Sequence, residues 1–441
     1  MRNTRKVLLV LSILLTGTAV FSDKAVAAGF FIQEQSVNGL GQAFAGIAAM
    51  PENASTIFYN PAGLTHLKPG THVTIGLHTI IPSADLKDKG STVDPIGGFP
   101  LGPIGGSNED PFDPILVPNI YLAHAVNPDL WVGLGVSSPY GLGNKYENQD
   151  FFGRYNSTSS NLLTVDIAPT MAYRVNEYLS VGASANIQYA KADLESSIPD
   201  PTGPNNIAAE GFQELEGQDW SASYTVGMII EPTEKIDVGL NYRHKMVHEL
   251  DGRLTVDLPD NIAGGIVIHN PGTADLDLPN IASLGVAYEH DDKLTLLGQV
   301  NWFGWSLFDD ITVDFDAPNP LDSSTFAVVP QGYKNTFSLA LGARYDYSQD
   351  WTLRGGVQYD ETPTQVDRST LVPDGDRYWI AGGATYHWRE NISLDFGATY
   401  IHVADETINL GETEAGGSLV NTRADIDSQI GILSVGMNYR F

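Results

Sequence analysis

The sequence predicts an all-β membrane protein, a closed barrel of fourteen antiparallel strands in an outer membrane. Three observations lead to this fold class. The chain begins with an export signal, long segments alternate apolar and polar residues with a period of two, and short turns alternate with long polar loops. This alternation of turns and loops is typical of outer-membrane barrels.

The N-terminus has the three parts of a secretory signal peptide. A basic start is followed by an apolar run over residues 7–20 and by the small-x-small cleavage pattern AVA at 25–27. We expect the signal peptide to span residues 1–27. The mature chain is expected to begin at Ala28, or at Gly29 if cleavage shifts by one residue. No later stretch has the roughly 20 consecutive apolar residues that a spanning helix needs.

The composition excludes several classes of protein. The chain carries 53 acidic and 24 basic residues and has a formal net charge of −29, so we expect no nucleic-acid partner. It has no Cys, so this exported protein is held together without disulfides. Charged residues make up only 17% of the chain, whereas Gly, Tyr and Phe number 45, 19 and 17. This balance suits a sheet that faces something other than water.

Two segments show the period of a strand without interruption. Residues 179–189, LSVGASANIQY, place apolar side chains at odd positions and small or polar ones at even positions. Residues 392–400, ISLDFGATY, repeat the pattern. Strands of soluble proteins usually have about 5–6 residues, whereas a tilted strand needs about 9–11 to cross a bilayer. These segments have the length of membrane-spanning strands.

Turns and loops give the number of strands. Six short polar turns alternate with seven longer segments rich in Asp, Gly and Pro, which implies fourteen strands. The sheet must close, because an open edge cannot lie in hydrocarbon. The turns are expected at 127–129, 176–177, 232–234, 290–292, 348–350 and 389–391, and the loops near 85–115, 141–160, 196–216, 258–278, 317–330, 362–375 and 406–423.

The last residues agree with this fold. Residues 433–441, LSVGMNYRF, alternate and end on the aromatic Phe441. Bacterial outer-membrane strands resemble this where the assembly machinery reads them, so we expect Phe441 to contact that machinery. The alternative is an ordinary amphipathic last strand. Outer-membrane lipid and lipopolysaccharide are the other expected surroundings.

A series of motifs resembles one family of transporters. AGFFIQEQSVNGLGQAFAGIAA at 28–49 and NPAGL at 60–64 are followed in order by SSPYGL, GLNYRHK, VNWFGWSLF, GYKNTFSLALGARY, GGVQYDETP and PDGDRYWIAGGATY. Together they resemble the FadL/TodX family of outer-membrane transporters of long-chain fatty acids and hydrophobic compounds. The resemblance covers essentially the whole mature chain.

The resemblance implies a domain organisation and a function. Residues 28–68 are expected to form a small N-terminal hatch that plugs the barrel of residues 69–441. The function implied is passive diffusion of hydrophobic small molecules, long-chain fatty acids or aromatic or aliphatic hydrocarbons, out through a lateral opening in the wall. The alternatives are a non-specific porin, against which the plug argues, and a barrel-embedded hydrolase, for which no catalytic motif stands out. We therefore expect neither an enzyme nor a cofactor.

The Asn-Pro step at 60–61 normally marks a turn, yet its neighbours are apolar. A turn inside a barrel explains this, because its surroundings are an interior. There Asn60 bonds local backbone, Pro61 fixes φ and Ala62 leaves room for close packing. Either this turn has no contact with substrate, or it is a latch that holds the hatch in register near the periplasmic end.

The resemblance places the lateral opening at an inward kink of the third strand, residues 131–142. Pro139 lacks an N–H and Gly141 relaxes the chain beside it, so we expect broken pairing there. The gate then consists of Ser138, Pro139, Tyr140 and Gly141. The alternative is that Pro139 merely ends the strand at the outer rim.

Ligand contacts are expected from the resemblance at Phe30, Phe31 and Lys334. Lys334 matches a basic position with which fatty-acid members of the family meet the carboxylate. A second such position falls on Ser196 here, which leaves neutral hydrocarbons open as ligands, because a buried anion needs a partner. The candidates for a substitute cation are Lys191 and Arg154.

We expect no metal site. His244 and His248 lie four residues apart on a strand, not on a zinc-binding helix. Several acidic loop residues offer oxygen ligands to divalent cations beside lipopolysaccharide, but such charges are usually solvated. These residues are Asp85, Asp88, Asp94, Glu109, Asp110 and Asp113.

Overall fold

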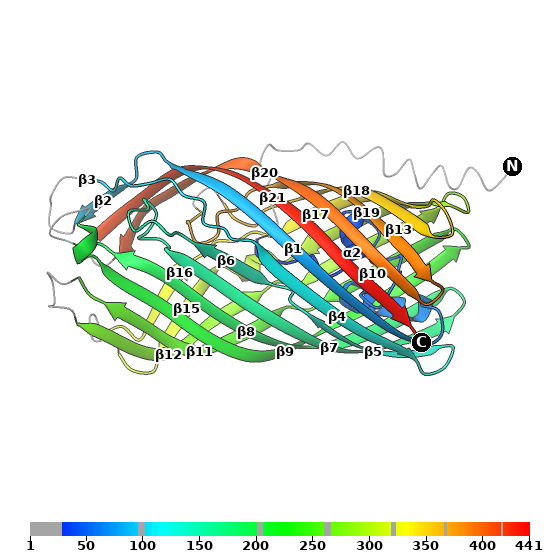
Figure 1. Ribbon diagram of the computed structural model, residues 1–441. Helices are drawn as coiled ribbons and strands as arrows, with labels where there is room; N and C mark the ends of the chain where they lie inside the picture. Colours follow the sequence, from blue (N-terminus) through cyan, green and yellow to red (C-terminus); the bar gives the residue numbers. More distant parts are fainter. Residues whose placement is uncertain are drawn as a thin grey trace.

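The barrel is closed. The computed structural model describes residues 29–95, 102–200, 206–259, 266–318, 323–365, 368–415 and 418–441, so the predicted signal peptide lies outside the described residues. Within them the strands form one antiparallel sheet that closes on itself (Figure 1). Strand β1 (Thr71–Asp88) pairs with the last strand, β21 (Ser418–Arg440), along nearly its whole length. No helix of the described residues is long and apolar enough to cross a membrane.

The described residues form the fourteen wall strands that the turns predicted. Nine wall strands are continuous. Each of the other five is split into two pieces, which lie one after the other between the same two adjacent wall strands. The continuous ones are β1, β4 (Ile115–Ala125), β7 (Ser159–Asn176), β8 (Leu179–Ile198), β9 (Gly211–Thr233), β18 (Trp351–Asp360), β19 (Arg377–Arg389), β20 (Ile392–Ala415) and β21. The split ones are β5 (Leu130–Ser137) with β6 (Gly141–Lys145), β10 (Ile236–Arg243) with β11 (Met246–Asp257), β13 (Ile281–Glu289) with β12 (Val267–Leu278), β14 (Leu294–Phe303) with β15 (Asp310–Phe315), and β17 (Thr336–Asp346) with β16 (Phe326–Pro330).

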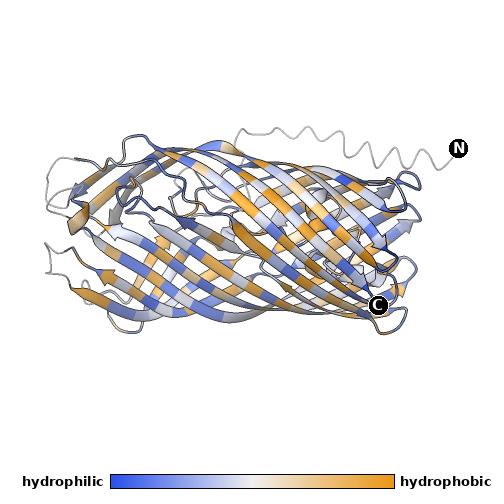
Figure 2. Cartoon of the chain, viewed as in Figure 1, coloured by the Kyte–Doolittle hydropathy of each residue, from blue (hydrophilic) through white to orange (hydrophobic). Residues whose placement is uncertain are grey.

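The alternation along each strand is inverted relative to a soluble protein. On β8 the polar Ser184, Asn186 and Gln188 are buried inside the barrel, whereas Ile187 faces outward. Exposed Leu, Val, Ile and aromatic side chains occur on nearly every strand. Figure 2 shows apolar residues, in orange, alternating with polar ones along the strands. An apolar belt on a wall with a polar interior is the arrangement of a membrane barrel.

All six short turns lie between strands as predicted, but two of the long loops are largely strand. Strand β20 runs to Ala415 and pairs with β21 up to Ala415↔Ser418, within the loop expected near 406–423. Strand β12 likewise occupies most of the loop expected near 258–278. Their polar composition suggested loops. Antiparallel pairing satisfies backbone groups equally well beyond the membrane, so composition there does not decide against a strand.

The N-terminal residues 29–67 lie inside the barrel, near the end where β21 terminates (Figure 1). Helix α2 (Val37–Gly41) packs against β18–β20 and β21. The short helices α3 (Thr56–Tyr59) and η1 (Pro61–His66) follow it, and η1 packs against β7–β9. A side chain on Gly41 would meet the Gly383 Cα at 2.8 Å, so this close approach requires a residue without a Cβ at both positions.

Two further short strands and two further short helices complete the described elements. Strands β2 (Thr92–Pro95) and β3 (Gly102–Pro103) pair with each other in the first outer loop, and β2 also pairs with β21. Helix η2 (Ile207–Ala209) lies between β8 and β9, and helix η3 (Trp305–Leu307) between β14 and β15. Helix η3 interrupts its wall strand and turns Trp305 into the interior.

Candidate functional site

The wall is interrupted in the predicted third strand. Strands β5 and β6 are separated at residues 138–140, and the ladder between β4 and β5 stops at Ile120↔Val136. Among the described residues, β6 has no ladder with β4, so the outer half of β4 pairs only with β1. Because β6 continues the strand along β7, Pro139 does not end the strand at the rim.

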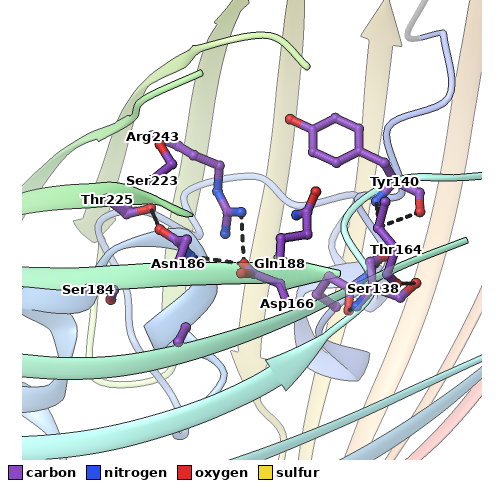
Figure 3. A network of polar contacts seen from close by, with 12 residues as sticks. Ser138, Tyr140, Thr164, Asp166, Ser184, Asn186, Gln188, Ser223, Thr225 and Arg243 are labelled. Atoms are coloured by element: carbon purple, nitrogen blue, oxygen red, sulfur yellow. Dashed lines mark hydrogen bonds and ion pairs between the residues drawn. The ribbon is translucent and has the colours of Figure 1, made fainter. Parts of the chain in front are cut away.

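On its other side the interruption is closed by side chains of β7. The Ser138 hydroxyl donates to the Thr164 carbonyl at 2.6 Å, and the Tyr140 N–H donates to the Thr164 hydroxyl at 3.0 Å (Figure 3). The Thr164 hydroxyl donates in turn to the Tyr140 carbonyl at 2.6 Å. The third strand therefore remains bonded to β7 along its length and loses its pairing only with β4.

The N-terminal segment takes the place of β4 at the interruption. The Ile32 N–H donates to the Pro139 carbonyl at 2.8 Å, and the Gly141 N–H donates to the Phe30 carbonyl at 3.0 Å. The Gln35 side-chain amide also donates to the Ser138 carbonyl at 2.8 Å. The backbone groups that the kink removes from the wall are thus satisfied from inside the barrel.

The gap between β4 and β6 is a window with defined edges. The Ile120↔Val136 pair closes the window on the side of β5, and the Lys145 N–H, which donates to the Pro111 carbonyl at 2.8 Å, closes it at the far end of β6. A cavity of about 220 Å³ runs through it. Its lining includes Ile115, Leu116 and Val117 of β4, Gly141, Leu142 and Gly143 of β6, and Phe30, Phe31, Glu34, Asp374 and Arg377 inside the barrel.

Residues of both faces of the wall line the cavity. Leu116 is 62% exposed and Leu163, also in its lining, is 53% exposed, so both side chains lie on the apolar outer belt. Phe30 at the inner end is only 5% exposed. Most of the lining residues near the wall are apolar.

An aromatic cluster packs behind the inner end of the cavity, and its members Phe30 and Phe31 belong to the cavity lining. The Phe30 ring packs edge-on against Trp305 at 4.8 Å and Phe308 at 5.3 Å between ring centroids. Phe31 lies 5.4 Å from Tyr140 and 5.5 Å from Phe303. The Trp305 Nε1 and the Tyr333 hydroxyl in this cluster are buried without a hydrogen-bond partner. The predicted ligand residues Phe30 and Phe31 are thus brought together with the gate residue Tyr140.

Charged groups lie at the inner end of the cavity. The Arg377 guanidinium pairs with Asp374 at 3.0 Å and donates to the Gly29 carbonyl at 3.0 Å. Glu34 is buried beside them, and burial raises the pKa of its carboxyl to about 7, although Arg377 opposes the shift. The cavity is therefore apolar where it crosses the wall and polar at its end inside the barrel.

Asn60, which the sequence predicts to belong to a hatch motif, connects the N-terminal segment to the wall. The Asn60 side-chain amide donates to the carbonyls of Ala48 at 2.7 Å and Met228 at 3.0 Å, and its oxygen accepts from the Ala62 N–H at 3.2 Å. A side chain on Gly182 or Gly227 would overlap this turn, so the turn lies directly on the wall. Pro61 is the first residue of helix η1, where a backbone N–H would have no partner within the helix, so the lack of one in proline costs nothing.

The cations that the sequence predicts as partners of a carboxylate do not line this cavity. Lys334 is not in the lining of the cavity; its backbone N–H donates to the Pro363 carbonyl at 3.0 Å, and its charge acts on Glu406. Ser196 accepts a hydrogen bond from Gln213 at 2.8 Å. Arg154 is buried in an ion pair with Glu210 at 2.8 Å, and Lys191 is exposed on the outer face. Arg377 is the cation that lines the cavity, and PDGDRYW was its only signal in the sequence.

The histidines and acidic loops have other partners in the structure. His248 contacts Asp219 and Gln188, each at 3.1 Å, and His244 stacks on Tyr224 at 4.8 Å between ring centroids. In the first loop, Asp85 pairs with a neighbouring lysine, and Asp88, Glu109 and Asp110 accept hydrogen bonds from nearby loop and strand groups. Among the described residues, only Asp193, Glu195 and Glu214 form a group with metal-ligand spacing.

A polar network continues from the kink across the inner face. Asp166 on β7 pairs with Arg243 on β10 at 3.1 Å and accepts from Asn186 on β8 at 2.9 Å (Figure 3). Thr225 on β9 donates to Asn186 at 2.8 Å. The Arg243 guanidinium also lies 4.6 Å above the Phe58 ring of the N-terminal segment. This network forms the polar side of the lumen, opposite in character to the aromatic cluster.

A closed β-barrel with a lipid-facing belt, an internal N-terminal segment and an apolar passage through its wall defines an outer-membrane transport protein. Residues 18–441 match the family described as outer membrane protein transport protein (OMPP1/FadL/TodX), and the chain belongs to this family. Its members are transport channels, which agrees with the expectation that the chain is not an enzyme. The predicted outer-membrane location is confirmed by the same match.

A sequence relative and two solved structures match nearly the whole chain. The long-chain fatty acid transport protein of Escherichia coli O6:H1 is 25% identical, with 99% of this chain and 100% of that protein covered. A crystal structure of a Pseudomonas aeruginosa FadL homologue superposes with a TM-score of 0.82 at 23% identity, covering 94% of this chain and 100% of that one. The Pseudomonas putida toluene transporter TodX gives a TM-score of 0.66 at 16% identity, covering 95% and 99%.

Proposed function

We propose that this protein passes hydrophobic small molecules from the barrel interior sideways into the outer leaflet of the membrane. The observation that carries the proposal is the apolar cavity that spans the window between β4 and β6. A solute that left along the barrel axis would meet the hatch and the polar network of Asp166 and Arg243. The lateral route instead keeps it on apolar surface, which avoids the cost of exposing that surface to water.

Residues 29–67 act as the hatch in this proposal. Their side chains fill the barrel near its periplasmic end, and Asn60 fastens them to β9. Because they also supply the hydrogen bonds of the kinked strand, the hatch holds the window in shape. A non-specific porin needs an open lumen, so the buried packing of this segment favours the lateral route.

The head group of the solute is proposed to meet the aromatic cluster. Trp305 Nε1 and the Tyr333 hydroxyl are buried donors without partners, and both rings pack on Phe30. Such donors suit a carboxylate or hydroxyl of an amphiphile, because an unpaired buried donor costs about 1–3 kcal/mol. Names of similar proteins include both fatty acid and toluene transport, so the substrate proposed is a fatty acid or a neutral hydrocarbon.

Outer-membrane partners belong to the proposal as well. We expect lipid and lipopolysaccharide to surround the exposed apolar belt, and the assembly machinery to recognise the terminal strand with Phe441. Phe441 is 64% exposed and stacks on Tyr439, so its ring is accessible for such recognition.

A reversible cross-link across the window tests the lateral route. The chain has no Cys, so Ile115→Cys with Gly143→Cys introduces the only two thiols. A Cβ at Gly143 would lie 3.6 Å from the end of the Ile115 side chain, so a short bifunctional thiol reagent with a disulfide spacer spans the pair. Uptake of labelled fatty acid or hydrocarbon into cells should stop when the pair is joined and return after reduction.

Each single-cysteine variant treated with the same reagent is the control. The folded state is checked by the shift in electrophoretic mobility on heating. If the joined protein takes up both solutes at the rate of the reduced protein, the solute leaves by another route and the proposal is wrong.

A further inference from the structure

The backbone of β4 alternates between its two neighbours, as in any antiparallel sheet. The Ala125 N–H donates to the Gly70 carbonyl, just before β1, at 3.0 Å. The Val126 N–H donates to the Leu130 carbonyl, at the start of β5, at 2.9 Å. Both ladders keep a constant register along β4. Its odd-numbered residues therefore bond β1, and its even-numbered residues face the third strand and the window.

The even-numbered residues at the window are short of donors. Pro118 is the next even-numbered residue after Ile120, whose pair with Val136 is the last of the ladder, and proline has no N–H. Leu116 follows with one N–H. Pro114, directly before β4, again has none. The side chains of both prolines are exposed, so neither is required to fill the interior.

The opposite border of the window presents backbone groups that no ladder uses. The Tyr146 N–H, just past β6, donates to the Thr158 carbonyl at 2.9 Å, and the ladder between β6 and β7 keeps that register. The even-numbered residues of β6 therefore bond β7, and the odd-numbered Gly141, Gly143 and Lys145 face the window. The N–H groups of the outer two have partners, as described above. Gly143 lies between them and has no ladder partner among the described strands.

The donor that Pro139 lacks belongs to the other side of the strand. In β5 the odd-numbered residues bond β7, since the Arg174 N–H donates to the Asp129 carbonyl at 2.8 Å and the register stays constant. Residue 139 continues this alternation, and the Thr164 carbonyl on β7 accepts from the Ser138 hydroxyl instead. Pro139 therefore removes a donor toward β7, which a side chain replaces, and not a donor toward β4.

We propose that Pro118 and Pro114 hold the window open, because they remove the donors with which β4 would pair with the third strand. A strand edge with a full set of donors is a template for pairing, and proline is a common means of blocking it. The two borders are close, since a Cβ on Gly143 would lie 3.6 Å from the end of the Ile115 side chain. Both prolines are positioning residues. Their effect on uptake rests on the lateral route proposed above.

Restoring the two donors tests this assignment. Pro114→Val with Pro118→Val returns two N–H groups and two residues favoured in strands, at exposed positions. A ladder between β4 and β6 should form, which a crystal structure of the variant shows directly. Amide exchange at Leu116 and Gly143 should slow by about tenfold or more. Pro271→Val, at an exposed proline of β12, is the matched control and should change neither measurement.

A third variant separates the two sides of the strand. Pro139→Val returns a donor toward β7 only, so the window should stay open and uptake should remain near the unmodified rate. If the double variant does not fold, Pro118→Val alone takes its place. This single change adds one donor next to the existing Ile120↔Val136 pair, so the ladder should lengthen from there.

Uptake of labelled fatty acid into cells separates this inference from the lateral route. A new ladder with uptake slowed about tenfold supports both. A new ladder with unchanged uptake supports the role of the prolines and contradicts the lateral route. The assignment is overturned if neither proline variant of β4 forms a ladder, or if Pro139→Val alone closes the window. Those two results leave the lateral route standing, because the cross-link across the window tests it independently.

Discussion

At the scale of single residues, Phe30 joins the N-terminal segment to the wall, since its ring contacts Tyr140, Trp305, Phe308 and Tyr333. Phe30→Ala removes these contacts and leaves a void, which typically costs about 3–5 kcal/mol in a packed core. We expect weaker binding of a fluorescent fatty acid, by about tenfold or more, in a barrel that still folds. Phe112→Ala, at the loop end of the cavity lining, is a comparison with less packing. Unchanged binding would remove Phe30 from the ligand site.

Lys334 and Tyr333 are two candidates for contact with the polar head group of a fatty acid. Lys334→Ala should weaken fatty-acid binding more than binding of a neutral hydrocarbon of similar size if Lys334 meets the carboxylate, as its motif predicts. Tyr333→Phe should have the same selective effect if the unpartnered hydroxyl is the contact, since it removes one donor and little volume. Titration calorimetry with both ligand classes measures the difference. Equal losses for both ligands in a variant exclude that residue as a head-group partner.

At the scale of elements, the hatch turn depends on Asn60. Asn60→Ala leaves the Ala48 and Met228 carbonyls without their donor, at a cost of about 1–3 kcal/mol, and loosens the contact between η1 and β9. Hydrogen exchange over residues 29–67 should become faster, while exchange in the wall strands stays slow. Asn148→Ala, in an exposed loop, is the control. Protection of the hatch equal to that of the unmodified protein would mean that the turn is no latch.

At the scale of the whole molecule, the packed interior predicts a closed channel. Planar-bilayer recordings of the intact protein should show little steady conductance, because residues 29–67 fill the lumen. Glu52 of the N-terminal segment pairs with Arg354 on β18 and with Arg344 on β17, so Glu52→Gln combined with Asn60→Ala should increase the frequency of openings. Large, steady, porin-like conductance in the intact protein would contradict the hatch.

Sequence alone determined the features that depend on neighbouring residues. Strand periodicity and turn composition are local properties, and they predicted the fourteen strands. The missing N–H at Pro139 is local too and suggested broken pairing, but the resemblance at SSPYGL was needed to prefer a kink over a strand end. Local composition also explains the failures near 406–423 and 267–278, because polar residues suit a loop and an extramembrane strand equally.

Only the tertiary structure decided the contents of the passage. Gly29 and Asp374 lie 345 residues apart in the chain and meet because barrel closure brings β19 beside the N-terminal segment. The same closure places Arg377 in the cavity and leaves Lys334 outside its lining. Which side chains share an interior depends on the register of all the strands between them, and no single segment of the sequence carries that information.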